Sequence, residues 1–305
     1  MRKMRHGIAW LVGLAIVGSS LGGARGDGSS SPAIPQETAP APSEPKLAWQ
    51  TSYAAAMELA KERQQMLFLY FHRPERAELE LFDRWIRETA DGAKLAESMG
   101  FCHLPTDLKV TSEGRELRLL DHAAFAHMEG NPGVAMIDCV DETAETYGRV
   151  VSVYPVTSSR RLDSRVVTKL SQLPPGTLTQ RSLVLAVALH RESPRSITGR
   201  WNPMLAQETQ SHSDHQARIR VQGHHNWGNR FNRIVGRLGG ALSAQEVCAE
   251  SWPGQGLMDA AEECVASWRQ SSGHWQAVSS PQAAFAYDMK QGSNGVWYAT
   301  GIFAR

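Results

Sequence analysis

The chain has 305 residues, which is more than one typical globular domain needs and is about the length of two. Its 32 lysines and arginines nearly balance its 31 aspartates and glutamates, so the formal net charge is +1. No overall field attracts a polyanion, and we expect no nucleic-acid partner.

The N-terminus has the pattern of an export signal. Residues 1–26 combine basic residues, an apolar run from Ile8 to Val17 and small residues, as in a secretory signal peptide. The apolar run is shorter than the roughly 20 residues that span a bilayer. An uncleaved N-terminal anchor is the alternative. After cleavage we expect no transmembrane span and a secreted or periplasmic protein, with residues 27–46, rich in Pro and Ser, as a flexible tether.

Residues 47–172 alternate between helical and strand patterns. Continuous apolar runs are typical of buried strands, and amphipathic runs are typical of helices. The patterns predict helices over 52–65, 77–99, 114–128 and 159–173, strands over 66–71 and 101–107, and a hairpin of 133–140 with 148–155. This order predicts an α/β domain with helices on both faces of a sheet.

Two segments of this domain, "LYFHRPERAEL" and "GNPGVAMID", resemble the thioredoxin-like family. Phe71 and Pro74 match the approach to the redox motif of that family, and Pro132 matches its cis-proline. Arg76 and Leu79 occupy the two cysteine positions. Because thiol–disulfide exchange needs both sulfurs, the resemblance implies a thioredoxin-like mixed sheet flanked by helices that carries no dithiol chemistry.

A Pro-Pro-Gly segment, residues 173–181, predicts a linker before a second domain at 182–305. The patterns predict helices over 178–193, 202–223 and 257–268, with Gly223 as the cap of the second, and two strands within 283–305. The stretch 228–243 is polar and interrupted by glycines, and no element is assigned to it. His274 is expected just beyond the end of the third helix.

The order of the segments "HHNW", "AES", "WRQSSGH" and "VWYATGIF" resembles the CAP superfamily of cysteine-rich secretory and pathogenesis-related proteins. The resemblance implies a CAP-type α-β-α sandwich. It places Glu250 and His274 across a cleft from either His224 or His225. Two imidazoles and a carboxylate form a plausible divalent-metal site, with zinc as the natural candidate.

Each candidate residue also has a simpler structural explanation. A histidine near a helix end is commonly a hydrogen-bonding group, and His212 and His215 have the spacing of a ligand pair but are more simply exposed. Trp227 and Trp252 fit either a core or a sugar-stacking role. Cys102 and Cys139 fit buried free thiols, whereas Cys248 and Cys264 have the option of pairing. A basic run is interpreted as a solvated face, with anionic lipid or wall polymer as the alternative: Arg218, Arg220, Arg230, Arg233 and Arg237.

The sequence favours binding over catalysis. It has no nucleophile elbow, no HExxH helix and no phosphate-binding loop. The favoured function is a secreted, non-catalytic protein of the cell envelope or extracellular space that binds a lipid, glycan or protein ligand. The alternative is a metal-dependent hydrolase of extracellular peptides or glycans that uses the cleft histidines and glutamate.

Overall fold

The computed structural model describes residues 49–73, 84–85, 89–112, 114–240 and 242–305. The N-terminal signal and tether, and the positions Arg76 and Leu79, therefore lie outside the described residues. The described residues combine helices with mixed sheets and all belong to one compact unit that spans residues 43–305. No helix among them is both long and apolar enough to cross a bilayer.

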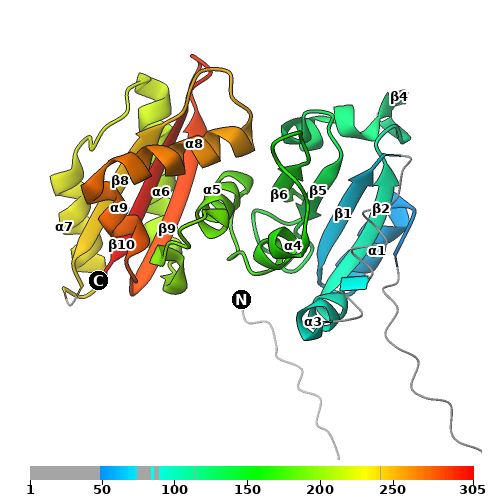
Figure 1. Cartoon of the computed structure of the whole chain (residues 1–305), viewed down its shortest axis with the longest axis horizontal. Coiled ribbons are helices and arrows are strands. Elements are labelled where there is room, and N and C mark those ends of the chain that lie inside the picture. The colour runs from blue at the N-terminus through cyan, green and yellow to red at the C-terminus, as the bar shows by residue number, and fades with distance from the viewer. Residues whose placement is uncertain (1–48, 74–83, 86–88, 113, 241) are drawn as a thin grey trace, which may run out of the picture. The chain divides into compact units, whose positions relative to one another are not determined.

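The first sheet has the strand order β2-β1-β5-β6 (Figure 1). Strand β1 pairs in parallel with β2 and antiparallel with β5, which pairs antiparallel with β6. The predicted strands and the predicted hairpin are therefore confirmed. The elements of this half are α1 (Tyr53–Glu62), β1 (Met66–His72), α3 (Ala90–Ser98), β2 (Met99–Pro105), β3 (Lys109–Ser112), β4 (Arg115–Arg118), η1 (Leu119–Asp121), η2 (Ala123–Met128), β5 (Gly133–Ile137), β6 (Val150–Pro155) and α4 (Ser164–Ser171).

Two predictions in this half were wrong. The helix expected over 114–128 is instead strand β4 followed by two 3-10 helices, because Arg115–Arg118 pairs with β3 and the extended backbone of His122 separates the two turns. No peptide bond among the described residues is cis, so Pro132 follows a trans bond. The neighbouring Gly133 is required by close packing, since a Cβ there would lie 2.2 Å from the carbonyl oxygen of Tyr154.

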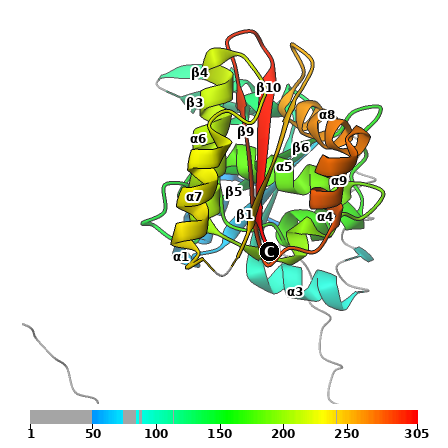
Figure 2. The same ribbon diagram turned by 90° about the vertical axis from the view of Figure 1, so that its left-hand side faces the viewer.

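The second sheet has the order β7-β9-β10-β8, with β8 at its edge. Helices α6 and α7 lie on one side of β9 and β10, whereas α8 and α9 lie on the other (Figure 2). The elements are α5 (Leu178–Leu189), η3 (Ser196–Thr198), β7 (Arg200–Trp201), α6 (Pro203–Ile219), α7 (Trp227–Arg237), β8 (Ala244–Glu250), α8 (Leu257–Gln270), α9 (Ser272–Ser279), β9 (Ala284–Gln291) and β10 (Trp297–Ala304).

Helix α7 occupies most of the glycine-interrupted stretch, to which the sequence patterns assigned no element. Trp227, Phe231, Ile234 and Val235 repeat at helical spacing and pack with α6 and the sheet, so the apolar face outweighs the two glycines of this helix. Helix α6 ends at Ile219, with Arg220 in the left-handed conformation, rather than at Gly223. This earlier end leaves a loop that carries His224 and His225 between α6 and α7.

The Pro-Pro-Gly segment is held by a buried arginine. Helix α5 begins at Leu178, inside the segment expected as a linker. The Arg181 guanidinium donates to the Ser152 hydroxyl at 2.8 Å and to the Pro174 carbonyl at 2.7 Å. Burial lowers the pKa of Arg181 to about 10. The carbonyls of Leu173 and Pro174 accept hydrogen bonds from this cation, and Asp138 adds a favourable electrostatic interaction.

Candidate functional site

A polar cluster lies on one face of the edge strand β8. Side chains alternate along a strand, so Val247 and Ala249 pack in the larger core cluster that includes α8. Ala244 packs in the cluster that includes α6 and α7, and Glu246 and Cys248 share its face of the strand. A buried carboxylate and a buried thiol therefore point toward the side of the sheet where α6 and α7 lie.

His224 and His274 meet at this edge. His224 comes from the α6–α7 loop and His274 from α9, which starts after the extended backbone of Ser271. The Nε2 atoms of the two rings are 3.3 Å apart. Two nitrogens bound to one tetrahedral zinc at 2.0–2.1 Å are separated by about 3.3–3.4 Å, the edge of the tetrahedron. The structure brings together the two histidines that the sequence pairs, at a separation that suits two ligands of one metal ion.

Glu246 orients His224. Its Oε1 atom accepts a hydrogen bond of 2.9 Å from His224 Nδ1, and its Oε2 atom accepts one of 2.8 Å from Arg230 Nε. Burial alone would raise the pKa of Glu246, but His224, His212 and Arg230 together lower it. An ionised Glu246 fixes the His224 proton on Nδ1, which leaves the lone pair of Nε2 facing His274.

His274 remains a neutral imidazole more readily than a free histidine does. Burial and the neighbouring His224 lower its pKa. The side chain of His224 is 43 % exposed, so the pair is open to solvent. A neutral imidazole at His274 is in the protonation state that metal coordination requires.

His225 faces away from this pair. Its Nε2 atom lies 3.2 Å from the Val221 carbonyl oxygen, and its ring centroid is 5.6 Å from that of His215 and 6.2 Å from that of His212. The sequence left open whether His224 or His225 lies opposite His274, and in the structure it is His224.

Glu250 does not accompany the pair. It ends β8, opposite Tyr298 of β10, and is exposed, with no hydrogen bond or ion pair to any described residue. Four residues along a strand correspond to about 13 Å, so Glu250 and Glu246 are at separate places on β8. The carboxylate that contacts His224 is Glu246, and the role of Glu250 as a metal ligand stays a prediction. Alternation of inward residues along 244–250 is the signal that would have found Glu246.

A second, buried group lies behind the pair. His212, Glu246 and Cys248 have ligand atoms within 4.8 Å of one another and could hold a metal ion. Burial lowers the pKa of His212 to about 4 and raises that of Cys248 well above its usual value. A metal ion here would have to displace the thiol proton and would lie beside the Arg230 guanidinium, both of which weaken binding.

The four cysteines are free thiols. Cys248 faces the α6 side of the second sheet, whereas Cys264 packs in the core between α8 and the opposite face, so the optional disulfide between them does not form. Cys102 and Cys139 are buried free thiols, as predicted. Trp227 belongs to the core around α7, whereas Trp252 is 67 % exposed.

The first half contains another histidine pair. His72 Nε2 lies 3.3 Å from His103 Nδ1, the same separation as at the exposed pair. His72 is only 3 % exposed, and its Nδ1 atom donates to the carbonyl of Arg73, a neutral acceptor, at 2.7 Å. This pair differs from the exposed one in that His72 is buried and no carboxylate of the described residues bonds to it.

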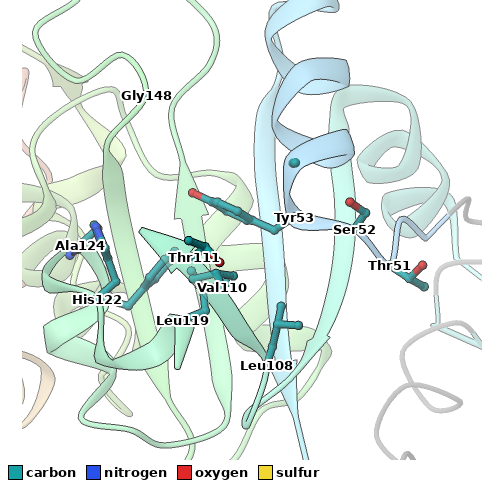
Figure 3. A pocket seen from close by; sticks show the side chains of 12 residues that line it. Thr51, Ser52, Tyr53, Leu108, Val110, Thr111, Leu119, His122, Ala124 and Gly148 are labelled. Atoms are coloured by element: carbon teal, nitrogen blue, oxygen red, sulfur yellow. Dashed lines mark hydrogen bonds between the residues drawn. The ribbon is translucent and has the colours of Figure 1, made fainter. Parts of the chain in front are cut away.

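The first half also contains a cavity of about 660 Å³. Figure 3 shows Ser52 and Tyr53, at the start of α1, on one side and Val110, Leu119 and His122 on the other. The Nδ1 atom of His122 accepts a hydrogen bond of 3.2 Å from the Ala124 amide. The cavity has the size of a small-molecule pocket, but its lining offers no set of groups for acid–base chemistry.

No protein-family model matches the chain, and no curated protein matches it significantly. The case for a function therefore rests on the residues of the two histidine-bearing regions and on their geometry.

Proposed function

We propose that the chain is a secreted or periplasmic binding protein of the cell envelope or extracellular space. In this proposal, residues 47–172 form a thioredoxin-like domain without redox cysteines, and residues 182–305 form a CAP-type sandwich whose cleft holds a divalent metal ion and a ligand. The presence of helices on both faces of the second sheet supports the sandwich.

The separation of 3.3 Å between the Nε2 atoms of His224 and His274 carries the proposal. These two nitrogens would hold zinc, with Glu246 orienting His224 through its Nδ1 proton. Zinc with two protein ligands keeps coordination positions for oxygen or nitrogen atoms of a ligand. The metal would thus add affinity for a lipid, glycan or protein that presents such atoms.

Binding fits the site better than hydrolysis does. A hydrolase needs a free general base within hydrogen-bond reach of the attacking water. Both oxygens of Glu246 already accept hydrogen bonds, from His224 and Arg230. Burial keeps the neighbouring Cys248 thiol protonated. The groups beside the pair are therefore arranged to hold His224 in position rather than to transfer a proton.

Zinc titration by calorimetry on the full mature chain tests the proposal. We expect one-to-one binding that is lost in His274→Ala and retained in His225→Ala, because only His274 faces His224. His103→Ala is a second control, since it removes a histidine from the buried pair. Zinc binding that survives in His274→Ala, or that disappears equally in His225→Ala, would contradict the proposal.

Cys248→Ser separates the exposed pair from the buried group. If zinc binding is lost in this variant and kept in His274→Ala, the ion belongs to His212, Glu246 and Cys248 instead. Turnover of a peptide or glycan by the zinc-loaded protein, abolished in His274→Ala, would favour the metal-dependent hydrolase over the binding protein.

A further inference from the structure

A polar pocket lies between α6 and the start of α7, and its lining includes neither His224 nor His274. Its volume is about 410 Å³. Its lining includes three histidines and three arginines, together with a serine and two asparagines, and contains no aspartate or glutamate: His212, His215, His225, Arg218, Arg230 and Arg233. A concave surface lined in this way concentrates positive potential.

The nearby carboxylates do not neutralise this potential completely. Glu246 accepts from Arg230, and Glu208 accepts from Arg233 at 2.8 Å while it also lies 3.6 Å from Arg237. Arg230 and Arg233 thus each have a carboxylate partner, whereas Arg218, the third arginine of the lining, has no carboxylate partner among the described residues. The interpretation of the basic run as a solvated face is wrong for Arg230, which is buried, whereas Arg233 is exposed, as that interpretation expects.

Arg218 faces the pocket with only a neutral partner. Its guanidinium donates to the Nδ1 atom of His215 at 3.0 Å, so the other ring nitrogen of His215 carries a proton that is available for donation. The nearest acidic residue in the sequence, Asp214, pairs instead with Lys290, at an N···O distance of 3.7 Å. No carboxylate of the described residues therefore pairs with Arg218.

The remaining lining supplies uncharged donors. Asn226 and Asn229 lie at the start of α7, which spans Trp227–Arg237 and whose N-cap makes no side-chain hydrogen bond. The amides of its first turn lack partners within the helix, and the helix dipole is positive at this end. These neutral donors add to the positive charge of the arginines that line the pocket.

We propose that this pocket binds the phosphate group of a small phosphorylated compound or of a lipid headgroup. Arginine and amide donors around one concavity suit an oxyanion with several acceptor oxygens. Burial, Arg218 and His225 lower the pKa of His215, which agrees with an electropositive site that repels a metal cation. The pocket is larger than a phosphate ion and leaves room for an attached organic group.

Arg218 and Arg220 are two residues apart in the sequence and provide a matched pair of variants to test phosphate binding. Arg218 lines the pocket, whereas Arg220, also exposed, does not. Arg218→Glu and Arg220→Glu change the net charge equally. We expect Arg218→Glu to weaken binding of inorganic phosphate, measured by calorimetry on the full mature chain, by at least about tenfold, and Arg220→Glu to weaken it less than about twofold.

Cosedimentation with phosphatidylcholine vesicles, with and without phosphatidylglycerol, distinguishes the two sources of phosphate. Arg218-dependent binding to phosphatidylglycerol vesicles alone identifies a lipid headgroup, and Arg218-dependent binding of free phosphate identifies a soluble compound. Equal losses in Arg218→Glu and Arg220→Glu would overturn the proposal, because the effect would then be one of net charge. Absence of binding to both probes would also overturn it.

Asn229→Asp provides a variant that does not threaten folding. A carboxylate in the first turn of α7 stabilises the helix through its dipole but repels an anion in the pocket. We expect an unchanged or higher melting temperature together with phosphate binding weakened about tenfold or more. Unaltered phosphate binding in a folded Asn229→Asp protein would contradict the proposed site.

Discussion

Two buried carboxylates of the second sheet, Glu246 on the edge strand β8 and Asp288 on β9, respond to burial in opposite ways. The side chain of Glu246 is 0 % exposed and its pKa is lowered. Asp288 is 2 % exposed, and burial raises its pKa to about 7. Both carboxylates are removed from water, so burial alone does not explain the difference.

The difference lies in their partners. Glu246 accepts hydrogen bonds from Arg230 and His224, and a cation beside a buried carboxylate favours the ionised form. Asp288 accepts from the Thr179 hydroxyl at 2.7 Å and from the Met289 amide, which are neutral donors. Glu246 is therefore held ionised, as an orienting group must be, whereas Asp288 is an acid that titrates near neutral pH.

The largest effect is expected from Glu246→Gln. This variant removes the charge that compensates Arg230, which is itself buried. Breaking a buried ion pair leaves one charge unpaired, and we expect the free energy of unfolding to fall by about 3–5 kcal/mol. Urea unfolding at neutral pH measures the change. A loss below about 1 kcal/mol would mean that the environments of Glu246 and Asp288 differ less than their hydrogen-bond partners indicate.

Asp288→Asn is expected to remove a pH dependence. Because the pKa of Asp288 is raised to about 7 in the folded protein, its contribution to stability is full below its unfolded pKa near 3.9 and is lost as the pH rises through 7. Between about pH 4 and pH 8 the wild type should lose about 2–4 kcal/mol relative to the variant. Unfolding curves across this range measure the difference, and parallel curves would contradict it.

Thr179→Val sharpens the comparison at Asp288 with little change in shape. It removes the only side-chain hydrogen bond to the ionised carboxylate among the described residues. We expect a loss of about 1–2 kcal/mol at pH 8 and a smaller loss near pH 5, where Asp288 is protonated. Equal losses at both pH values would show that the hydroxyl acts through packing alone.

Glu250→Gln is expected to have the smallest effect. Glu250 is exposed and makes no hydrogen bond or ion pair with the described residues. Stability should stay within about 0.5 kcal/mol, and zinc binding should not change. A zinc affinity that falls in Glu250→Gln would support this residue as a ligand and would place the metal farther along β8.

Much of the fold could be predicted from local patterns. The apolar run at β1 and the hairpin of β5 and β6 are strong strand signals, and the structure has them where they were expected. Helix α7 was missed because Gly228 and Gly236 are loop signals, whereas tertiary packing of Phe231 and Ile234 decides its structure. Propensity is a weak guide where an apolar face can be buried.

The sequence indicated the two histidines of the candidate site but not the carboxylate and the arginine beside them. His224 and His274 are fifty positions apart, and the resemblance brought them together before the structure did. Glu246 was missed because β8 was not recognised as a strand, so its inward positions could not be counted. Arg230 was interpreted as solvated because a basic run does not show which of its members meets a buried carboxylate.

The position of Glu246 also bears on self-association. Strand β8 pairs with β10 along one edge only among the described residues. An unpaired strand edge is a template for a strand from another molecule, and a charged side chain directed inward from such a strand opposes flat strand-to-strand assembly. Val247, Cys248 and Ala249 are at most 2 % exposed, so this edge is covered within the folded molecule. Loss of the Glu246 charge would therefore promote aggregation through β8 only to the extent that it uncovers the edge.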